Sequence, residues 1–198
     1  MEAPLGGTTM GKQTKRNRAI EAAADLFLRH GFARTTMGDI AQAAEMSRPA
    51  LYLIFPGKEE VFEAAVLHLN TLRIAEIERA VAEVQGLADK LFVACDLWLV
   101  QVFALQREIP DARDMDDLAF PVVRKVYIHL QVVLAGLIAD AIPAKRLAAP
   151  AEELARGLVF AVRGLGATAR DVDDMRQMTR LQVDLMCAAL TETPLPIR

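Results

Sequence analysis

The stretch AAADLFLRHGFARTTMGDIAQAAEMSRPALYLIF, residues 22–55, decides the fold. Its beginning continues a pattern in which apolar residues recur with the 3.6-residue period of a helix, from Ile20 to Leu28. Gly31 follows as a residue suited to the position after a helix end, because glycine adopts positive φ at little cost. The pattern therefore predicts a first helix over about residues 15–29.

Two short helices are predicted in the second half of this stretch. Thr36 suits the N-cap of the first helix, and Asp39 three residues later completes a capping box. Ser47 suits the N-cap of the second helix, which should end at Phe55 because Pro56 disfavours helical backbone in the residue before it. The three-residue break between them is the spacing of a helix-turn-helix motif, whose second helix lies in the major groove of DNA.

The rest of the chain also has helical patterning, and the expected fold class is all-α. Helices are expected over residues 57–82, 87–108, 120–142, 150–170 and 171–193. The sequence contains no alternation of strand period, so no sheet is expected. It contains no uncharged apolar run of 18 residues, so no transmembrane helix is expected either.

Charge is distributed unevenly along a chain whose net charge is only −3. Residues 1–58 carry eight basic and five acidic side chains, whereas the remaining residues are net acidic. A basic segment indicates an anionic partner, although a chance fluctuation of a few charges explains the same counts. The two cysteines, Cys95 and Cys187, cannot form a disulfide framework and fit a reducing compartment. We expect a cytoplasmic protein.

Residues 22–62 resemble the N-terminal domain of the TetR (tetracycline-repressor-like) family of bacterial regulators. The resemblance rests on the quoted stretch, on PGKEEVF at residues 56–62, and on these residues within them: Phe27, Gly31, Phe32, Thr36, Ile40, Ala41, Ala44, Ser47, Leu51, Tyr52, Phe55 and Lys58. It implies a homodimer that binds double-stranded operator DNA and is released by a small ligand. The implied parts are a flexible N-terminus (1–11), a helix-turn-helix DNA-binding domain (12–58) and a helical ligand-binding and dimerisation domain (59–198).

The resemblance assigns DNA contacts to individual residues. The implied contacts are made by Thr36, Ser47, Arg48, Pro49, Tyr52, Leu53 and Lys58. Arg48 and Pro49 would approach base edges, and the hydroxyl and ammonium groups would contact phosphates, which helix N-termini attract. Helix capping is a second role for the two N-cap residues. The alternatives are core packing for Tyr52 and a solvated charge for Arg48.

Four positions depart from the family pattern. Glu45 stands where glycine is usual in the turn, so a positive φ there would be uncommon, and its charge lies near DNA. Leu53 and Ile54 stand where polar or aromatic residues are frequent, and their side chains donate no hydrogen bonds. Arg48 is then the main side-chain donor of this helix, and contact with thymine methyl groups or shape readout could substitute for further donors. Gly38 stands where a polar side chain is common, and it costs about 1 kcal/mol of helix stability relative to alanine.

A ligand cavity and a dimer interface are implied for the remaining chain. The expected cavity residues, which suit a small hydrophobic effector, are Phe92, Trp98, Phe103, Tyr127 and Phe160. The expected dimer residues, on the last two helices, are Gly157, Ala161, Gly164, Thr168, Met178, Leu181 and Leu185. Ordinary core packing is the alternative for each aromatic residue, and packing within one chain is the alternative for the dimer face. Asp96, an acid among the aromatic residues, is expected to be solvated.

The leading hypothesis is a homodimeric transcriptional regulator, a repressor released from a palindromic operator by a small hydrophobic molecule. The alternative is a helical ligand-binding or adaptor protein without specific DNA readout, which the departures at Glu45, Leu53 and Ile54 favour. An enzyme ranks third, because the sequence offers no nucleophile–base pair and no glycine-rich phosphate loop. No cofactor, metal site or membrane partner is expected.

Overall fold

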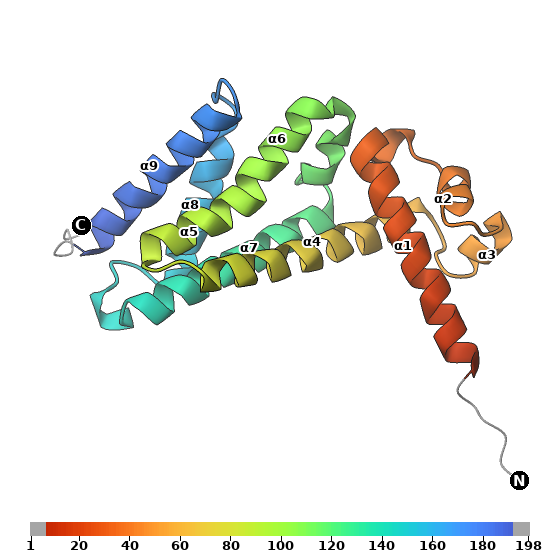
Figure 1. The fold of residues 1–198 in the computed structure, drawn as a ribbon, viewed down its shortest axis with the longest axis horizontal. Helices are drawn as coiled ribbons and strands as arrows, with labels where there is room; N and C mark the ends of the chain where they lie inside the picture. The colour runs from red at the N-terminus through yellow and green to blue at the C-terminus, as the bar shows by residue number, and fades with distance from the viewer. Residues whose placement is uncertain (1–6, 192–198) are drawn as a thin grey trace, which may run out of the picture. The chain divides into compact units, whose positions relative to one another are not determined.

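The computed structural model describes residues 7–191, and within that range the chain is helical without any strand, which confirms the predicted all-α fold (Figure 1). Its contacts form two compact units, residues 1–71 with 109–123 and residues 72–108 with 124–198. We call the described residues of the first unit the head and those of the second unit the body. The domain boundary expected at residue 58 stays a prediction. Most of the flexible N-terminus expected over residues 1–11 lies outside the described residues.

The head is built from four helices and a 3₁₀ segment. They are α1 (Gly7–Arg34), α2 (Met37–Ala43), α3 (Arg48–Tyr52), the first part of α4 (Lys58–Ala82) and the 3₁₀ helix η2 (Pro110–Asp116). Gly31 breaks the regular helix of α1 with φ of 71° and ψ of 170°, which only glycine adopts readily. The predicted break at Gly31 is therefore confirmed, while α1 begins earlier than the sequence pattern indicated. In Figure 1, α2 packs beside α1 and α3 beside α2.

A cluster of aromatic rings forms much of the head core. Phe27 is fully buried, and its ring centroid lies 5.2 Å from that of Phe62 in an edge-to-face contact. Phe32 contacts both rings, and Phe120, which is distant in sequence, lies 4.9 Å from the Phe62 ring. Ile40, Leu51 and Phe55 of the quoted stretch are also buried. These residues, which carry the family resemblance, therefore form the core of the helix-turn-helix.

Residues 110–116 pack against the C-terminal end of α1. Asp114 accepts a hydrogen bond from the Ala33 N–H at 3.0 Å, and Asp111 forms an ion pair with Arg34. The Asp111 backbone lies so close to Gly31 that a Cβ on that glycine would come within 3.0 Å of the Asp111 carbonyl carbon and overlap its oxygen. Glycine is therefore required at position 31 both for its backbone angles and for this close approach.

The body contains the remaining helices. They are the end of α4, then α5 (Leu87–Cys95), the π-helical turn η1 (Asp96–Val100), α6 (Gln101–Glu108), most of α7 (Pro121–Ala141), η3 (Ala144–Arg146), α8 (Ala151–Leu165) and α9 (Val172–Thr191). The predicted helix over 87–108 is confirmed, but it contains the unpredicted π turn. Helix α8 ends earlier than residue 170, and the expected end of the last helix lies outside the described residues.

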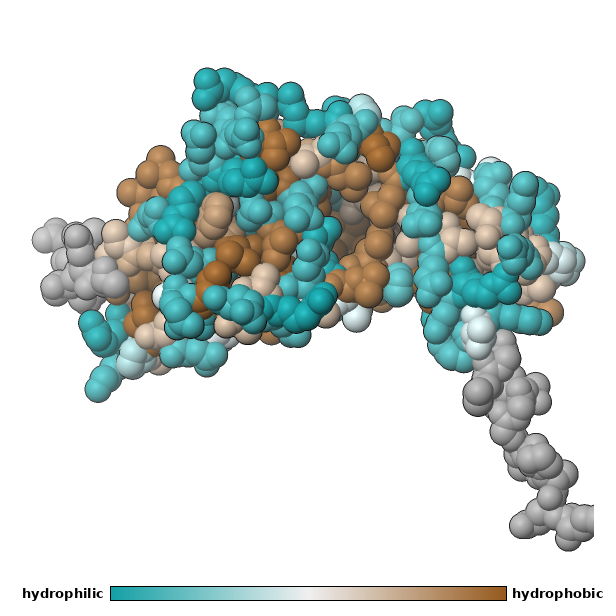
Figure 2. Space-filling model, viewed as in Figure 1, coloured by the Kyte–Doolittle hydropathy of each residue, from teal (hydrophilic) through white to brown (hydrophobic). Residues whose placement is uncertain are grey.

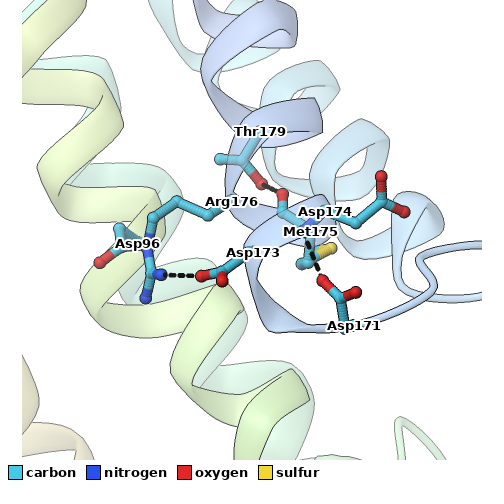
Figure 3. Close-up of polar contacts among 7 residues, drawn as sticks. All are labelled: Asp96, Asp171, Asp173, Asp174, Met175, Arg176 and Thr179. Carbon is cyan, nitrogen blue, oxygen red and sulfur yellow. Dashed lines mark hydrogen bonds and ion pairs between the residues drawn. The ribbon is translucent and has the colours of Figure 1, made fainter.

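Polar contacts join the start of α9 to the π turn (Figure 3). Asp171 caps α9 by accepting the Asp174 N–H at 2.8 Å. Arg176 bonds to Asp173 one turn earlier at 3.1 Å and to Asp96 at 2.7 Å. The expectation that Asp96 is solvated is wrong, because Arg176, 80 positions later, provides a charged partner that local sequence patterns cannot reveal.

Helix α7 has the length and apolar composition that would allow it to cross a membrane, which differs from the expectation of no such segment. A core helix passes the same test, and 44% of the most apolar window of α7 is buried inside the protein. Its residues Leu130, Leu134 and Ile138 are fully buried, with the spacing of one helix face. This burial places one face of α7 in the protein core, while Ile128 and Val132 on α7 are exposed.

Candidate nucleic-acid interface

Both helices of the helix-turn-helix carry the predicted caps. The Thr36 Oγ1 accepts the Asp39 N–H at 3.2 Å, and the Asp39 carboxylate accepts the Thr36 N–H at 2.9 Å, which completes the capping box. The hydrogen bonds from Thr36 lower the pKa of Asp39. Ser47 caps α3 by accepting the Ala50 N–H at 3.3 Å, with Pro49 in the first turn. The two N-termini on which DNA contacts were predicted are therefore well defined.

The side chains predicted to contact bases and phosphates lie mostly at the surface. Arg48 and Pro49 are exposed in the first turn of α3, and Tyr52 is 52% exposed, so it is not a core residue. Leu53, directly after α3, is 82% exposed. The exposed face of α3 thus combines one guanidinium, one phenol and an apolar group.

Lys58 differs from the other predicted contact residues, because it is partly buried and already has a partner. Its Nζ donates a hydrogen bond to the Phe32 carbonyl at 2.8 Å and lies 4.1 Å from the centre of the Phe32 ring. Lys58 therefore ties the start of α4 to the end of α1. Its predicted phosphate contact stays a prediction.

Glu45 occupies the turn between α2 and α3 with φ of 51°, the only positive φ of a non-glycine residue among the described residues. The expectation of an uncommon backbone conformation at this position is confirmed. Its carboxylate forms an ion pair with Arg18 of α1 at 2.7 Å, rather than with Arg48. Both partners are well exposed, so the pair contributes at most about 1 kcal/mol to stability. Glu45 nevertheless neutralises Arg18, one of the basic side chains of residues 1–58.

Replacing Glu45 with glycine is expected to tighten DNA binding. The change removes a negative charge from the candidate interface, frees Arg18, and places the residue best suited to positive φ in the turn. Electrophoretic mobility shifts at increasing salt measure the effect, and the gain should shrink as salt screens the lost repulsion. Glu45→Gln is the control for charge alone, because it keeps the side chain and the backbone restriction. Weaker DNA binding by a folded Glu45→Gly variant would contradict the prediction.

Three of the five predicted cavity residues meet in the body. The Trp98 ring lies edge-to-face on Tyr127, with ring centroids 4.7 Å apart, and Tyr127 is stacked with Phe160 at 6.0 Å. Arg163 donates a hydrogen bond to the Tyr127 hydroxyl at 2.9 Å. Trp98 and Tyr127 are buried, whereas Phe160 is 43% exposed. We call these three rings the aromatic row; two of them are buried, and the Phe160 ring at its end is accessible to solvent.

The other two predicted cavity residues have different surroundings. The Phe92 ring lies under the Arg180 guanidinium, and the Phe103 ring lies under that of Arg107. Phe103 also lies 3.3 Å from the position of a Cβ on Gly166. The five aromatic residues therefore do not form a single row, and the ligand role of each stays a prediction.

The predicted dimer residues lie on α8 and α9, two helices that pack against each other, except Thr168, which lies after the end of α8. Ala161 and Met178 are half-buried. Leu181 is 60% exposed and Leu185 is 59% exposed. Gly157 and Gly164 are exposed, and a Cβ on either would meet nothing within 4 Å. Figure 2 shows hydrophobic patches that reach the surface among hydrophilic side chains on the face that it draws. Exposed apolar side chains beside small residues are typical of a surface that another helix covers.

Neither cysteine resembles a catalytic or metal-binding thiol. Cys95 is buried in the body, and burial raises the pKa of its thiol to about 12. Burial also raises the pKa of Cys187. Among residues 7–191, no group of three or more histidine, cysteine, aspartate or glutamate side chains is arranged to hold a metal ion.

Several side chains of the candidate interface and of the body are placed by partners that are distant in sequence. The Arg18–Glu45 pair, the Lys58–Phe32 contact and the Asp96–Arg176 pair join residues 26 to 80 positions apart. No periodicity or capping signal identifies such partners. The single local signal is Gly38, an unexpected glycine inside a helix.

Comparison with known proteins agrees with this geometry. Residues 19–65 match the family model described as bacterial regulatory proteins, tetR family. The HTH-type transcriptional regulator TtgR of Pseudomonas putida is 38% identical over 77 residues, which cover 38% of this chain and 37% of the relative. The match thus spans little more than a third of the length of that curated relative.

Solved structures extend the likeness to the whole fold. A transcriptional regulator from Rhodococcus sp. Rha1 is 20% identical, with a TM-score of 0.64, over 87% of this chain and 96% of that chain. RolR in complex with resorcinol is 13% identical, with a TM-score of 0.66, over 96% of this chain and all of that chain. At these identities the likeness shows the fold alone. The match to the tetR family model lies within the head, and the rest of the chain is similar to the solved regulators in fold alone.

Proposed function

We propose that this protein is a homodimeric transcriptional regulator that binds operator DNA through α3 and is released from it by a small hydrophobic molecule. The observation that carries the proposal is the capped helix-turn-helix with Arg48, Tyr52 and Leu53 exposed on or directly after α3. A helix of this motif places such side chains against base edges and phosphates. TtgR, which shares this part of the sequence, is named as an HTH-type transcriptional regulator.

The ligand and dimer roles of the body rest on separate observations. The aromatic row of Trp98, Tyr127 and Phe160 has the composition of a site for a small apolar or aromatic molecule. RolR, which has a similar fold, was solved with resorcinol, a small aromatic molecule. The exposed leucines of α9 and the open glycines of α8 support a two-fold contact between copies. A protein with these roles acts in the cytoplasm, and the proposal includes no catalytic activity.

Selection of binding sites from a random pool of DNA duplexes tests the proposal. The wild-type protein should enrich a palindromic sequence, and the logarithm of its affinity should fall linearly with the logarithm of salt concentration. Tyr52→Phe removes only a phosphate contact and should weaken binding to all sequences alike. Arg48→Ala should relax the preference at one base pair of each half-site, at a cost of about 1–3 kcal/mol.

Failure of this selection has a defined meaning. If the folded wild-type protein enriches no sequence, specific DNA recognition is excluded and the alternative of a ligand-binding or adaptor protein replaces it. If a sequence is enriched but Arg48→Ala keeps both affinity and preference, α3 is not the recognition helix. Circular dichroism of each variant confirms that the head is folded.

A further inference from the structure

The missing side chain of Gly38 leaves the space in which the Arg48 guanidinium lies. Gly38 is in the first turn of α2, and Arg48 is the first residue of α3. A Cβ on Gly38 would lie 2.7 Å from the Arg48 Cζ and 2.9 Å from its Nε, and it would overlap Nη2. Such distances are shorter than side-chain carbons adopt. Only glycine at position 38 is therefore compatible with this placement of Arg48.

The backbone of α2 does not itself require a glycine at position 38. The described glycines with positive φ are Gly31 and Gly86, and Gly38 lies within a regular helix where alanine is favoured. Gly38 is thus an unfavourable choice for the helix and a necessary one for the neighbouring guanidinium. The geometry of α2 therefore does not explain why position 38 is a glycine, whereas the space beside the Arg48 guanidinium does.

The Asp39 carboxylate lies near the positive charge of Arg48, and Arg48 remains exposed. The neighbouring Asp39 has a lowered pKa, first through its hydrogen bonds with Thr36 and then through the positive charge of Arg48. Arg48 is exposed, so its guanidinium remains accessible while it lies against α2. A long, flexible side chain placed in this way loses less freedom when it binds a base edge.

We propose that Gly38 is a positioning residue that sets the place of the Arg48 guanidinium for base recognition. This inference rests on the proposed function and adds a determinant of its specificity in a helix other than the recognition helix. A side chain at position 38 pushes away the flexible end of Arg48, not the backbone. The consequence of substitution is therefore a change in base preference without loss of the fold.

Four variants in the random-duplex selection test the inference: Gly38→Ala, Arg48→Ala, the double variant, and Gly136→Ala. Gly38→Ala should reduce discrimination about tenfold at the base pair whose preference Arg48→Ala relaxes. Its melting temperature should be unchanged or higher, because alanine favours the helix. The double variant should match Arg48→Ala, since Gly38 acts only through Arg48. Gly136→Ala gains the same helix propensity in α7, where a Cβ meets nothing within 4 Å, and should select the wild-type sequence.

Two results would overturn the inference while the proposed function stands. One is a Gly38→Ala protein that selects the wild-type sequence with unchanged discrimination. The other is a further loss of preference when Gly38→Ala is added to Arg48→Ala, which would show an effect independent of the guanidinium. A wild-type protein that enriches no sequence overturns the proposed function and this role of Gly38 together.

Discussion

Replacing Gly31 with alanine is expected to destabilise the head by about 2–5 kcal/mol, a large part of the stability of a typical domain. The backbone angles at Gly31 are strained for any residue with a Cβ. The added Cβ also overlaps the Asp111 carbonyl oxygen, which is a backbone atom and cannot rotate away. The substitution should detach residues 110–116 from α1 and expose the rings of the head core.

The single tryptophan of the chain separates the effect on the head from any effect on the body. Trp98 is buried in the body, so its fluorescence follows the unfolding of the body, whereas circular dichroism follows all helices. For Gly31→Ala we expect an early loss of helical signal in urea that precedes the change in Trp98 fluorescence. The matched control is Gly86→Ala, where φ is +80° but a Cβ meets nothing within 4 Å. Equal costs for the two substitutions would show that the Asp111 contact does not limit position 31.

Replacing Gly164 with leucine should separate the proposed dimer into monomers that remain folded. A side chain at position 164 points into open space in the single chain, so the monomer has no reason to unfold. In a dimer covered through this face, the same leucine overpacks the contact at a cost of about 1–3 kcal/mol. Because two linked heads bind two half-sites together, operator affinity should fall by roughly 100-fold or more when the dimer is lost.

Light scattering and mobility shifts on the selected duplex measure these two effects. Gly136→Leu is the control, because it adds the same side chain to another open glycine on α7. A Gly164→Leu protein that stays dimeric and binds the duplex normally would exclude Gly157, Ala161 and Gly164 of α8 from the interface. The contact would then be sought at Leu181 and Leu185 of α9, which are more than half exposed.

The helix-turn-helix could be predicted in detail because its signals are local. Thr36, Ser47 and Pro49 specify helix starts through hydrogen bonds and backbone angles that span three or four residues. Gly31 marks a break through its own φ, and the unusual backbone at Glu45 followed from its place in the turn. Features of this kind depend only on residues that are close in the chain, so a single sequence is enough to predict them.

The candidate site was less predictable, because its side chains are placed by distant partners. Lys58 was expected to face DNA, yet its ammonium bonds to the Phe32 carbonyl. Gly38 looked like a weak point in a helix until the Arg48 guanidinium was located beside it. The exposure of Phe160 and the burial of Trp98 follow from tertiary packing that helical periodicity does not specify.

The contribution of residues 109–123 to the head has a consequence for how the chain is made. The ribosome synthesises the helix-turn-helix first, but Phe120 and the segment that packs on Gly31 emerge only after α4, α5 and α6. Part of the aromatic core of the nascent head therefore stays exposed until about 50 further residues have been synthesised. The ribosome adds roughly 5–20 residues per second. A fragment that stops at residue 71 would keep this core open permanently. The head is thus encoded early but completed late, and a piece of the gene that ends at residue 71 does not encode all of it.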